Sequence, residues 1–213
     1  IKTSGGIVVG LPEGKHGEFL SHRGYVKVDI LGISTLEVLQ NCYNVTGLMP
    51  PEPVGEEPAI SLLNIGNNAG IFQFKGHTMS GLLAQFKPKT FMDLVVLNGA
   101  GRGGADTQMY LDMRDSKTSV VWKNQIDDIC KNTFGIPIFQ EQFMSIYAFL
   151  LDTEFDDPLG RVDKMRKQIA KFRASPEANK AKDNLRKEIL TCAKNKGMTQ
   201  EQADLLWHFF NLA

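Results

Sequence analysis

The sequence predicts an α+β chain that is mainly helical, with a small β part at its beginning. Residues 1–33 hold the β-branched runs, and four prolines and two glycines fall within 44–59. After that stretch, the apolar residues follow helical spacing. We therefore expect a β region with one helix at 1–43, a linker at 44–59 and a helical domain at 60–213.

The strand expected at 24–32 has an apolar face and a polar face. Its β-branched residues alternate with Lys27 and Asp29, so the lysine and the carboxylate point away from the core. A fully buried strand would not tolerate these two side chains unpaired. The pair is either a solvated ion pair on an edge strand or a metal-binding carboxylate beside a phosphate-binding lysine.

Helices are expected in order along the rest of the chain. Ser34 and Glu37 have the form of a capping box for a helix at about 35–43, and Thr90 and Thr199 are candidate caps for two later helices. The segment 139–151 is apolar on most sides, which is typical of a core helix. The further helices are expected at 78–86, 91–99, 124–133, 159–173, 176–197 and from 200 through 209.

The helix expected at 159–173 combines an apolar stripe with a basic face. Its apolar residues recur at helical spacing, and the basic residues fall off that stripe, toward solvent or a ligand. The stripe consists of Val162, Met165, Ile169 and Phe172, and the basic residues are Lys164, Arg166, Lys167 and Lys171.

Charge is unevenly distributed in this neutral chain. Residues 161–196 hold 12 Lys and Arg against 4 Asp and Glu, a balance of +8, so the other residues carry −8. Such segregation favours an anionic partner. A solvated helical surface would have the same composition, and both interpretations stay open.

The sequence lacks the motifs that mark several classes of enzyme. The sequence has no nucleophile elbow, phosphate-binding P-loop or HExxH zinc motif. The adjacent acidic pairs at 127–128 and 156–157 are expected to be solvated or capping carboxylates. Three scattered cysteines and the lack of an apolar run of membrane-spanning length favour a cytoplasmic protein with reduced thiols and no membrane partner.

Six segments resemble, in order, the palm-to-fingers region of the alpha subunit of bacterial DNA polymerase III, a family C DNA polymerase. The strand at 25–32 resembles the family's "vKfDfLGL" strand, and 139–144 resembles "yQEQvM". The other matching segments are 5–9, 70–74, 86–94 and 162–167. The β part would then be a remnant of a nucleotidyltransferase-type palm, and the helices would be the first part of a fingers domain.

The resemblance implies roles for six residues. Asp29 would bind catalytic Mg²⁺ in a two-metal site, and Lys27 would contact the phosphates of the incoming nucleotide or order the aspartate. Arg166 and Lys167 would grip the triphosphate, with Arg102 and Lys171 assisting there or on DNA. Gln73 and the polar cluster at 140–142 are expected to support the fingers internally.

The departures from the family pattern limit what this chain can do. The strand with the family's other two metal-binding aspartates is expected upstream of Ile1, so we expect the isolated chain to be inactive. The implied partners are primer-template DNA, dNTPs, the remainder of the polymerase and other replisome subunits, in a bacterial nucleoid or a phage-infected cell. The alternative is a non-catalytic module that binds DNA or assists replisome assembly.

Overall fold

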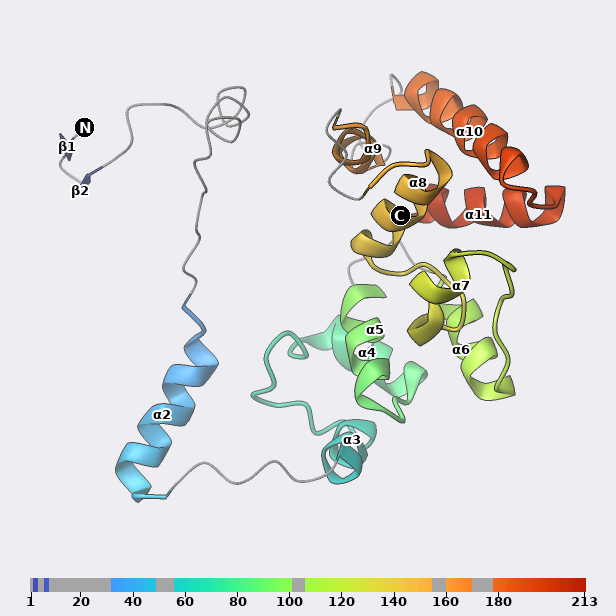
Figure 1. Cartoon of the computed structure of the whole chain (residues 1–213). Coiled ribbons are helices and arrows are strands. Elements are labelled where there is room, and N and C mark those ends of the chain that lie inside the picture. Colours follow the sequence, from blue (N-terminus) through green and yellow to red (C-terminus); the bar gives the residue numbers. More distant parts are fainter. Residues whose placement is uncertain are drawn as a thin grey trace. The chain divides into compact units, whose positions relative to one another are not determined.

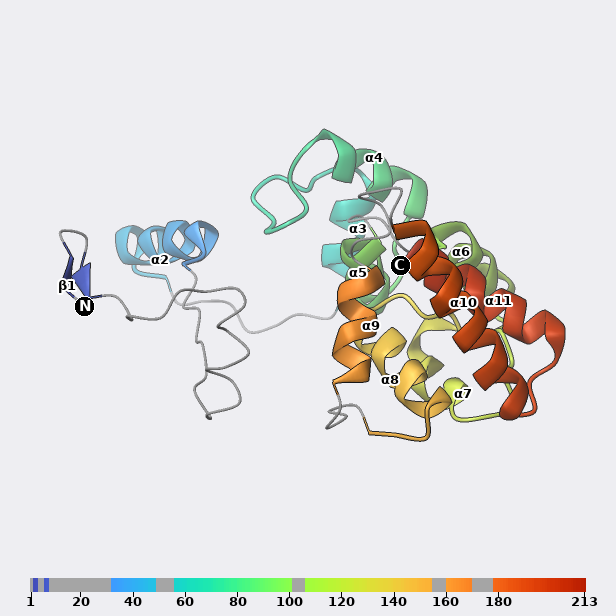
Figure 2. The same cartoon turned by 90° about the horizontal axis from the view of Figure 1, so that it is seen from above.

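The structure, a computed structural model, describes residues 2–3, 6–7, 32–48, 56–100, 106–154, 160–169 and 178–213. The chain forms two compact units, Ile1–Pro50 and Pro51–Ala213. Figures 1 and 2 show the elements of each unit in two views.

The first unit contains two very short strands and one helix. Strand β1 (Lys2–Thr3) pairs antiparallel with β2 (Gly6–Ile7), and helix α2 covers Ser34–Thr46. A pair of two-residue strands is too small to be stable alone. Residues 24–31 of the strand expected at 24–32 lie outside the described residues, so the structure does not show the palm-type β remnant.

Helix α2 confirms the helix expected at 35–43 but begins differently. Ile33 occupies the N-cap position, and no side chain caps the helix there. The predicted capping box of Ser34 and Glu37 is therefore wrong, because Ser34 already lies inside the first turn. The helix ends at Gly47, whose φ of 68° is the left-handed conformation that glycine adopts without strain.

The second unit is helical throughout its described part. The domain assignment of palm, linker and fingers stays a prediction, although both ends of the expected linker at 44–59 belong to helices α2 and α3. The elements of this unit are α3 (Glu56–Asn64), α4 (His77–Phe86), α5 (Phe91–Ala100), α6 (Thr107–Ser116), α7 (Ile126–Ile129), the 3₁₀ helix η1 (Lys131–Thr133), α8 (Gln140–Leu150), α9 (Arg161–Ile169), α10 (Ala178–Asn195) and α11 (Gln200–Leu212).

Helix α8 is the core helix of this unit, as the sequence predicts. Five of its side chains are buried, and it packs against α7, α9 and α10. Phe143 of α8 meets Phe210 of α11 edge to face, with ring centroids 5.1 Å apart. Aromatic burial of this kind contributes more than area alone. The core therefore holds α9 and α10, the two described helices richest in Lys and Arg, on a common support.

A buried carboxylate ties α5 to α6. Asp93, with 1% of its surface exposed, accepts hydrogen bonds from the backbone N–H of Lys89 and Thr90 and from the Tyr110 hydroxyl. Arg114 adds an ion pair at 3.5 Å. Thr90 Oγ1 in turn accepts from the Asp93 N–H, which confirms Thr90 as the cap of α5. Each polar atom of this cluster is satisfied, so a buried charge is tolerated here.

None of the described helices is both long enough and apolar enough to cross a membrane.

Candidate functional site

Helix α9 presents the basic face that the sequence predicts. The described part of its apolar stripe is buried, with Val162 and Met165 each 1% exposed and Ile169 7% exposed, and Phe172 lies outside the described residues. This stripe packs toward α8 and α10. Since side chains three, four and seven residues apart share one face, Arg166 and Lys167 are left on the open side of the helix.

Arg166 and Lys167 share one carboxylate on their own helix. Asp163 Oδ1 accepts from Nε and Nη2 of Arg166, at 2.9 and 2.7 Å, and Lys167 Nζ lies 2.7 Å from the Oδ2 atom of Asp163. The side chains of Arg166 and Lys167 are 38% and 48% exposed. The two cations are thus held together at a surface that a ligand can reach.

The carboxylate between the two cations stays ionised. The hydrogen bond from Lys167 and then those from Arg166 lower the pKa of Asp163, while partial burial opposes them. The cluster of Asp163, Arg166 and Lys167 therefore carries one net positive charge. Sequence reasoning gave Asp163 no role, although an acid three and four residues before two bases is the spacing that pairs on a helix.

The other four predicted site residues lie outside the described residues. Lys27, Asp29, Arg102 and Lys171 therefore keep their predicted roles untested. Of the six, the structure brings together only Arg166 and Lys167. Within the described ranges, no group of three or more His, Cys, Asp or Glu side chains could hold a metal ion.

Gln142 supports the fold internally, as expected. Its Oε1 accepts from the backbone N–H of Ile138 and Phe139, and its Nε2 donates to Thr133 Oγ1 at 2.9 Å and to the Ile129 carbonyl. These bonds use both ends of the amide. Gln142 thus joins the start of α8 to α7 and η1, and no part of this amide is left for a substrate.

Asp127 is a capping carboxylate, as expected. Its two oxygens accept from the backbone N–H of Trp122 and Lys123, both at 2.8 Å. These bonds hold the turn before α7. A metal-binding role for the acidic pair at 127–128 has no support in this geometry.

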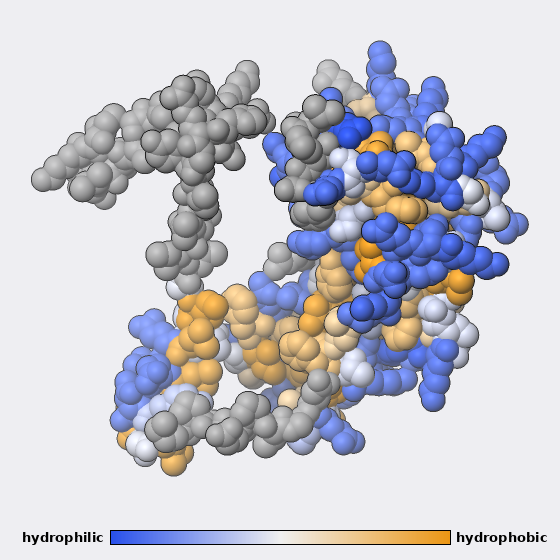
Figure 3. Space-filling model, viewed as in Figure 1, coloured by the Kyte–Doolittle hydropathy of each residue, from blue (hydrophilic) through white to orange (hydrophobic). Residues whose placement is uncertain are grey.

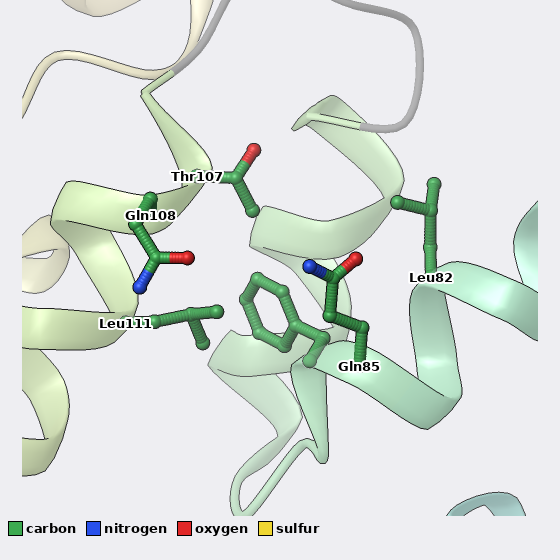
Figure 4. Close-up of a pocket in the computed structure, with 6 residues that line it drawn as sticks. Leu82, Gln85, Thr107, Gln108 and Leu111 are labelled. Atoms are coloured by element: carbon green, nitrogen blue, oxygen red, sulfur yellow. The ribbon is translucent and has the colours of Figure 1, made fainter.

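A small cavity of about 190 Å³ lies between α4 and α6. Figure 4 shows Gln85 on one side of this space and Thr107 and Gln108 on the other, and Phe86 also belongs to the lining. Leu82 and Leu111 complete the described lining. None of these six side chains is charged, so they offer nothing to neutralise a phosphate. The lining of this cavity is therefore uncharged, unlike the cation pair of α9.

The comparisons with known proteins identify a family for most of the chain. Residues 36–197 match the family described as the bacterial DNA polymerase III alpha subunit finger domain. The chain belongs to this family. The match includes α9 and α10, so the cation pair of Arg166 and Lys167 lies within the finger domain.

Relatives named as polymerases match most of the chain. The DNA polymerase III subunit alpha of Treponema pallidum is 26% identical over 193 residues, which are 85% of this chain and 16% of that protein. The same subunit of Chlamydia trachomatis is 28% identical over 70% of this chain and 12% of its own length. An error-prone DNA polymerase of Pseudomonas fluorescens is 26% identical over 70% of this chain and 15% of that enzyme. The chain spans about a sixth or less of the length of these relatives.

Proposed function

We propose that this chain acts within a family C replicative DNA polymerase, where Arg166 and Lys167 of α9 hold the triphosphate of the incoming dNTP. The observation that carries the proposal is the placement of two cations side by side on the open face of a finger-domain helix. Phosphoryl transfer depends on cationic groups that position and neutralise the phosphates.

Arg166 and Lys167 suit this task in different ways. A guanidinium presents a planar fork of N–H donors, whereas an ammonium acts as a compact point charge. Arg166 uses Nε and Nη2 on Asp163, and its Nη1 has no hydrogen bond to the described residues. One edge of the guanidinium is therefore available to a phosphate while the other edge stays fixed.

The palm contribution is proposed from the sequence. Asp29 would bind Mg²⁺, and Lys27 would contact the nucleotide phosphates or order Asp29. Arg102 and Lys171 would add positive charge to the same pocket or to DNA. When bound, Mg²⁺ would neutralise developing charge on the phosphates and lower the pKa of the attacking hydroxyl. Since a two-metal site needs more carboxylates than Asp29, the chain is expected to be inactive alone.

A mixing experiment tests this function. The full chain is combined with a second polypeptide that bears the other two palm aspartates, and extension of a primer on a template is followed with Mg²⁺ and dNTPs. We expect extension only in the mixture, and we expect Asp29→Asn to abolish it. Arg166→Gln should raise the KM for dNTP, whereas Lys131→Gln, at an exposed residue of η1, should not.

Two results would count against the proposal. Extension that survives Asp29→Asn would remove Asp29 from the metal site. A mixture that binds DNA but never extends a primer would favour the second candidate, a non-catalytic module that binds DNA or assists replisome assembly. The observation that favours this candidate is the +8 balance of residues 161–196.

A further inference from the structure

Helix α10 has a row of lysines on the side away from the core. Its buried residues Leu185, Ile189 and Ala193 face the rest of the unit, where α10 packs against α8, α9 and α11. Figures 1 and 2 show α10 at the edge of the second unit. The opposite side of α10 is therefore an outer surface of this unit.

Three lysines follow this outer side at a regular interval. Lys180, Lys187 and Lys194 are each separated by seven residues and are all exposed. Seven residues are almost two full turns, so the three side chains leave the helix in nearly the same direction. At about 1.5 Å rise per residue, successive lysines lie about 10.5 Å apart along the axis. We call these three residues the lysine ladder.

The charge of the lysine ladder is not neutralised by the described part of the chain. None of its three ammonium groups forms an ion pair with a described carboxylate. Both acids of α10 are exposed: Glu188 hydrogen-bonds Tyr147, and Asp183 lies beside the ladder, three residues after Lys180 and four before Lys187. Figure 3 shows hydrophilic side chains along this edge of the unit.

We infer that the lysine ladder binds the phosphate backbone of duplex DNA. A straight row of cations about 21 Å long fits a stiff, linear polyanion, and duplex DNA carries one negative charge per about 1.7 Å of axis. Surfaces that hold single strands combine charge with aromatic side chains on which bases stack. Helix α10 contains no aromatic residue, so the ladder reads backbone charge and not bases.

This inference rests on the proposed function for its partner, but it concerns a different surface from the cation pair of α9. The α9 pair would hold the nucleotide, whereas the ladder would hold the duplex. The two can be tested separately, because a phosphate-backbone contact shows itself in the salt dependence of DNA binding.

The test replaces the whole ladder. In the full chain, Lys180, Lys187 and Lys194 are all changed to Gln. This variant and the wild type are titrated into a fluorescent 20-base-pair duplex of arbitrary sequence at a series of KCl concentrations. Each phosphate contact contributes about −0.9 to the slope of log Kobs against log salt. We expect the slope to become shallower by about 2 to 3 and the affinity at low salt to fall at least tenfold.

A charge-matched variant serves as the control. Lys75, Lys117 and Lys131 are exposed on other elements, and changing all three to Gln removes the same charge. We expect this control to lose less than threefold in affinity. Both triple variants should keep the wild-type far-UV circular dichroism spectrum, because Gln and Lys have similar helix propensities and all six side chains are exposed.

Three results of this titration would overturn all or part of the inference about the lysine ladder. Equal losses in the two triple variants would overturn the ladder and leave DNA as a diffuse electrostatic partner. Tighter binding of a 20-nucleotide single strand, with the same dependence on the ladder, would overturn the choice of duplex. A wild-type chain that does not bind the duplex at all would overturn both the ladder and DNA as a partner of this chain alone. Nucleotide binding at α9, measured with inorganic triphosphate, would remain independent of that result.

Discussion

Asp163 sets the amount of positive charge that Arg166 and Lys167 present to a ligand. The carboxylate accepts from both side chains, and its pKa is lowered first by Lys167 and then by Arg166. A bound phosphate must share the two cations with this carboxylate or displace it. Because the pair is half exposed, the contact itself contributes little to stability.

We expect Asp163→Asn to tighten the binding of inorganic triphosphate to the full chain. Removing one negative charge about 4 Å from the phosphates is worth about 1 kcal/mol in water, so the expected gain is about threefold to tenfold. Isothermal titration calorimetry at low and high salt measures it, and the gain should shrink as salt screens the charges.

Asp128→Asn is the control for this prediction, since Asp128 is exposed on α7 and the change in net charge is the same. An equal gain in both variants would mean that only net charge matters. A loss of affinity in Asp163→Asn would mean that Asp163 orients the cations more than it neutralises them.

At this residue scale, the sequence predicted the exposed cations but not their counter-charge. The helical period placed Arg166 and Lys167 off the apolar stripe, and the structure confirms this. The role of Asp163 could have been found from its spacing, because an acid at i pairs with bases at i+3 and i+4. The roles of Lys27, Asp29, Arg102 and Lys171 depend on contacts between distant segments and stay predictions.

At the scale of elements, Gln202 joins the last helix to a distant loop. Its Oε1 accepts from the backbone N–H of Thr199, and Thr199 Oγ1 accepts from the Gln202 N–H, which confirms the cap predicted at Thr199. The Gln202 amide also donates to the carbonyls of Val121 and Trp122. One side chain thus serves the start of α11 and a contact across the fold.

We expect Gln202→Ala to lower the free energy of unfolding by about 1 to 3 kcal/mol, because it removes half of the capping box and leaves the Trp122 carbonyl without this donor. Urea denaturation followed by circular dichroism measures the change. Gln200→Ala is the matched control, since Gln200 lies on the same helix and donates only to the exposed Asp204. Equal effects of the two substitutions would contradict the proposed bridge.

The elements that sequence reasoning placed well are those fixed by local signals. Helices α8, α9 and α11 have a clear apolar period or cap, and they lie within a few residues of their expected positions. The sequence does not predict helix α3, because Pro58 falls in the expected linker at 44–59. Proline is tolerated in the first turn, where the missing N–H has no helical partner.

The helix expected at 124–133 is divided into two short elements in the structure. The structure has α7 and η1 there, and the segment ends at Phe134 and Gly135 with positive φ values of 55° and 78°. A side chain at Gly135 would overlap the carbonyl of Val120, which lies against it. The backbone of Val120 therefore leaves room only for glycine at 135, directly after the point where this helical segment ends.

At the scale of the whole molecule, the buried core described for this chain lies in the second unit. The buried hydrophobic residues run from Ile60 to Phe210, and α2 of the first unit buries none of its side chains. The three cysteines lie in both units, one in the first and two in the second. Cys42 is exposed on α2, Cys130 is fully buried after α7, and Cys192 is partly buried on α10.

Thiol reactivity should therefore report the two units separately. Burial raises the pKa of Cys130 to about 12 and also raises the pKa of Cys192. Since the thiolate is the reactive form, both should be labelled slowly at pH 8. With a chromogenic disulfide reagent, we expect one fast thiol in the native chain, removed by Cys42→Ser, and three fast thiols in concentrated urea.

The urea dependence of the slow thiols extends this expectation. Cys130 should become reactive only as the second unit unfolds, at the same urea concentration at which the helical signal is lost, because no smaller opening exposes a side chain at the centre of a packed core. Labelling of Cys130 as fast as Cys42 in the native chain would contradict the burial described for α7 and its neighbours. A labelling midpoint well below the loss of helical signal would show that α7 and η1 open before α8 does.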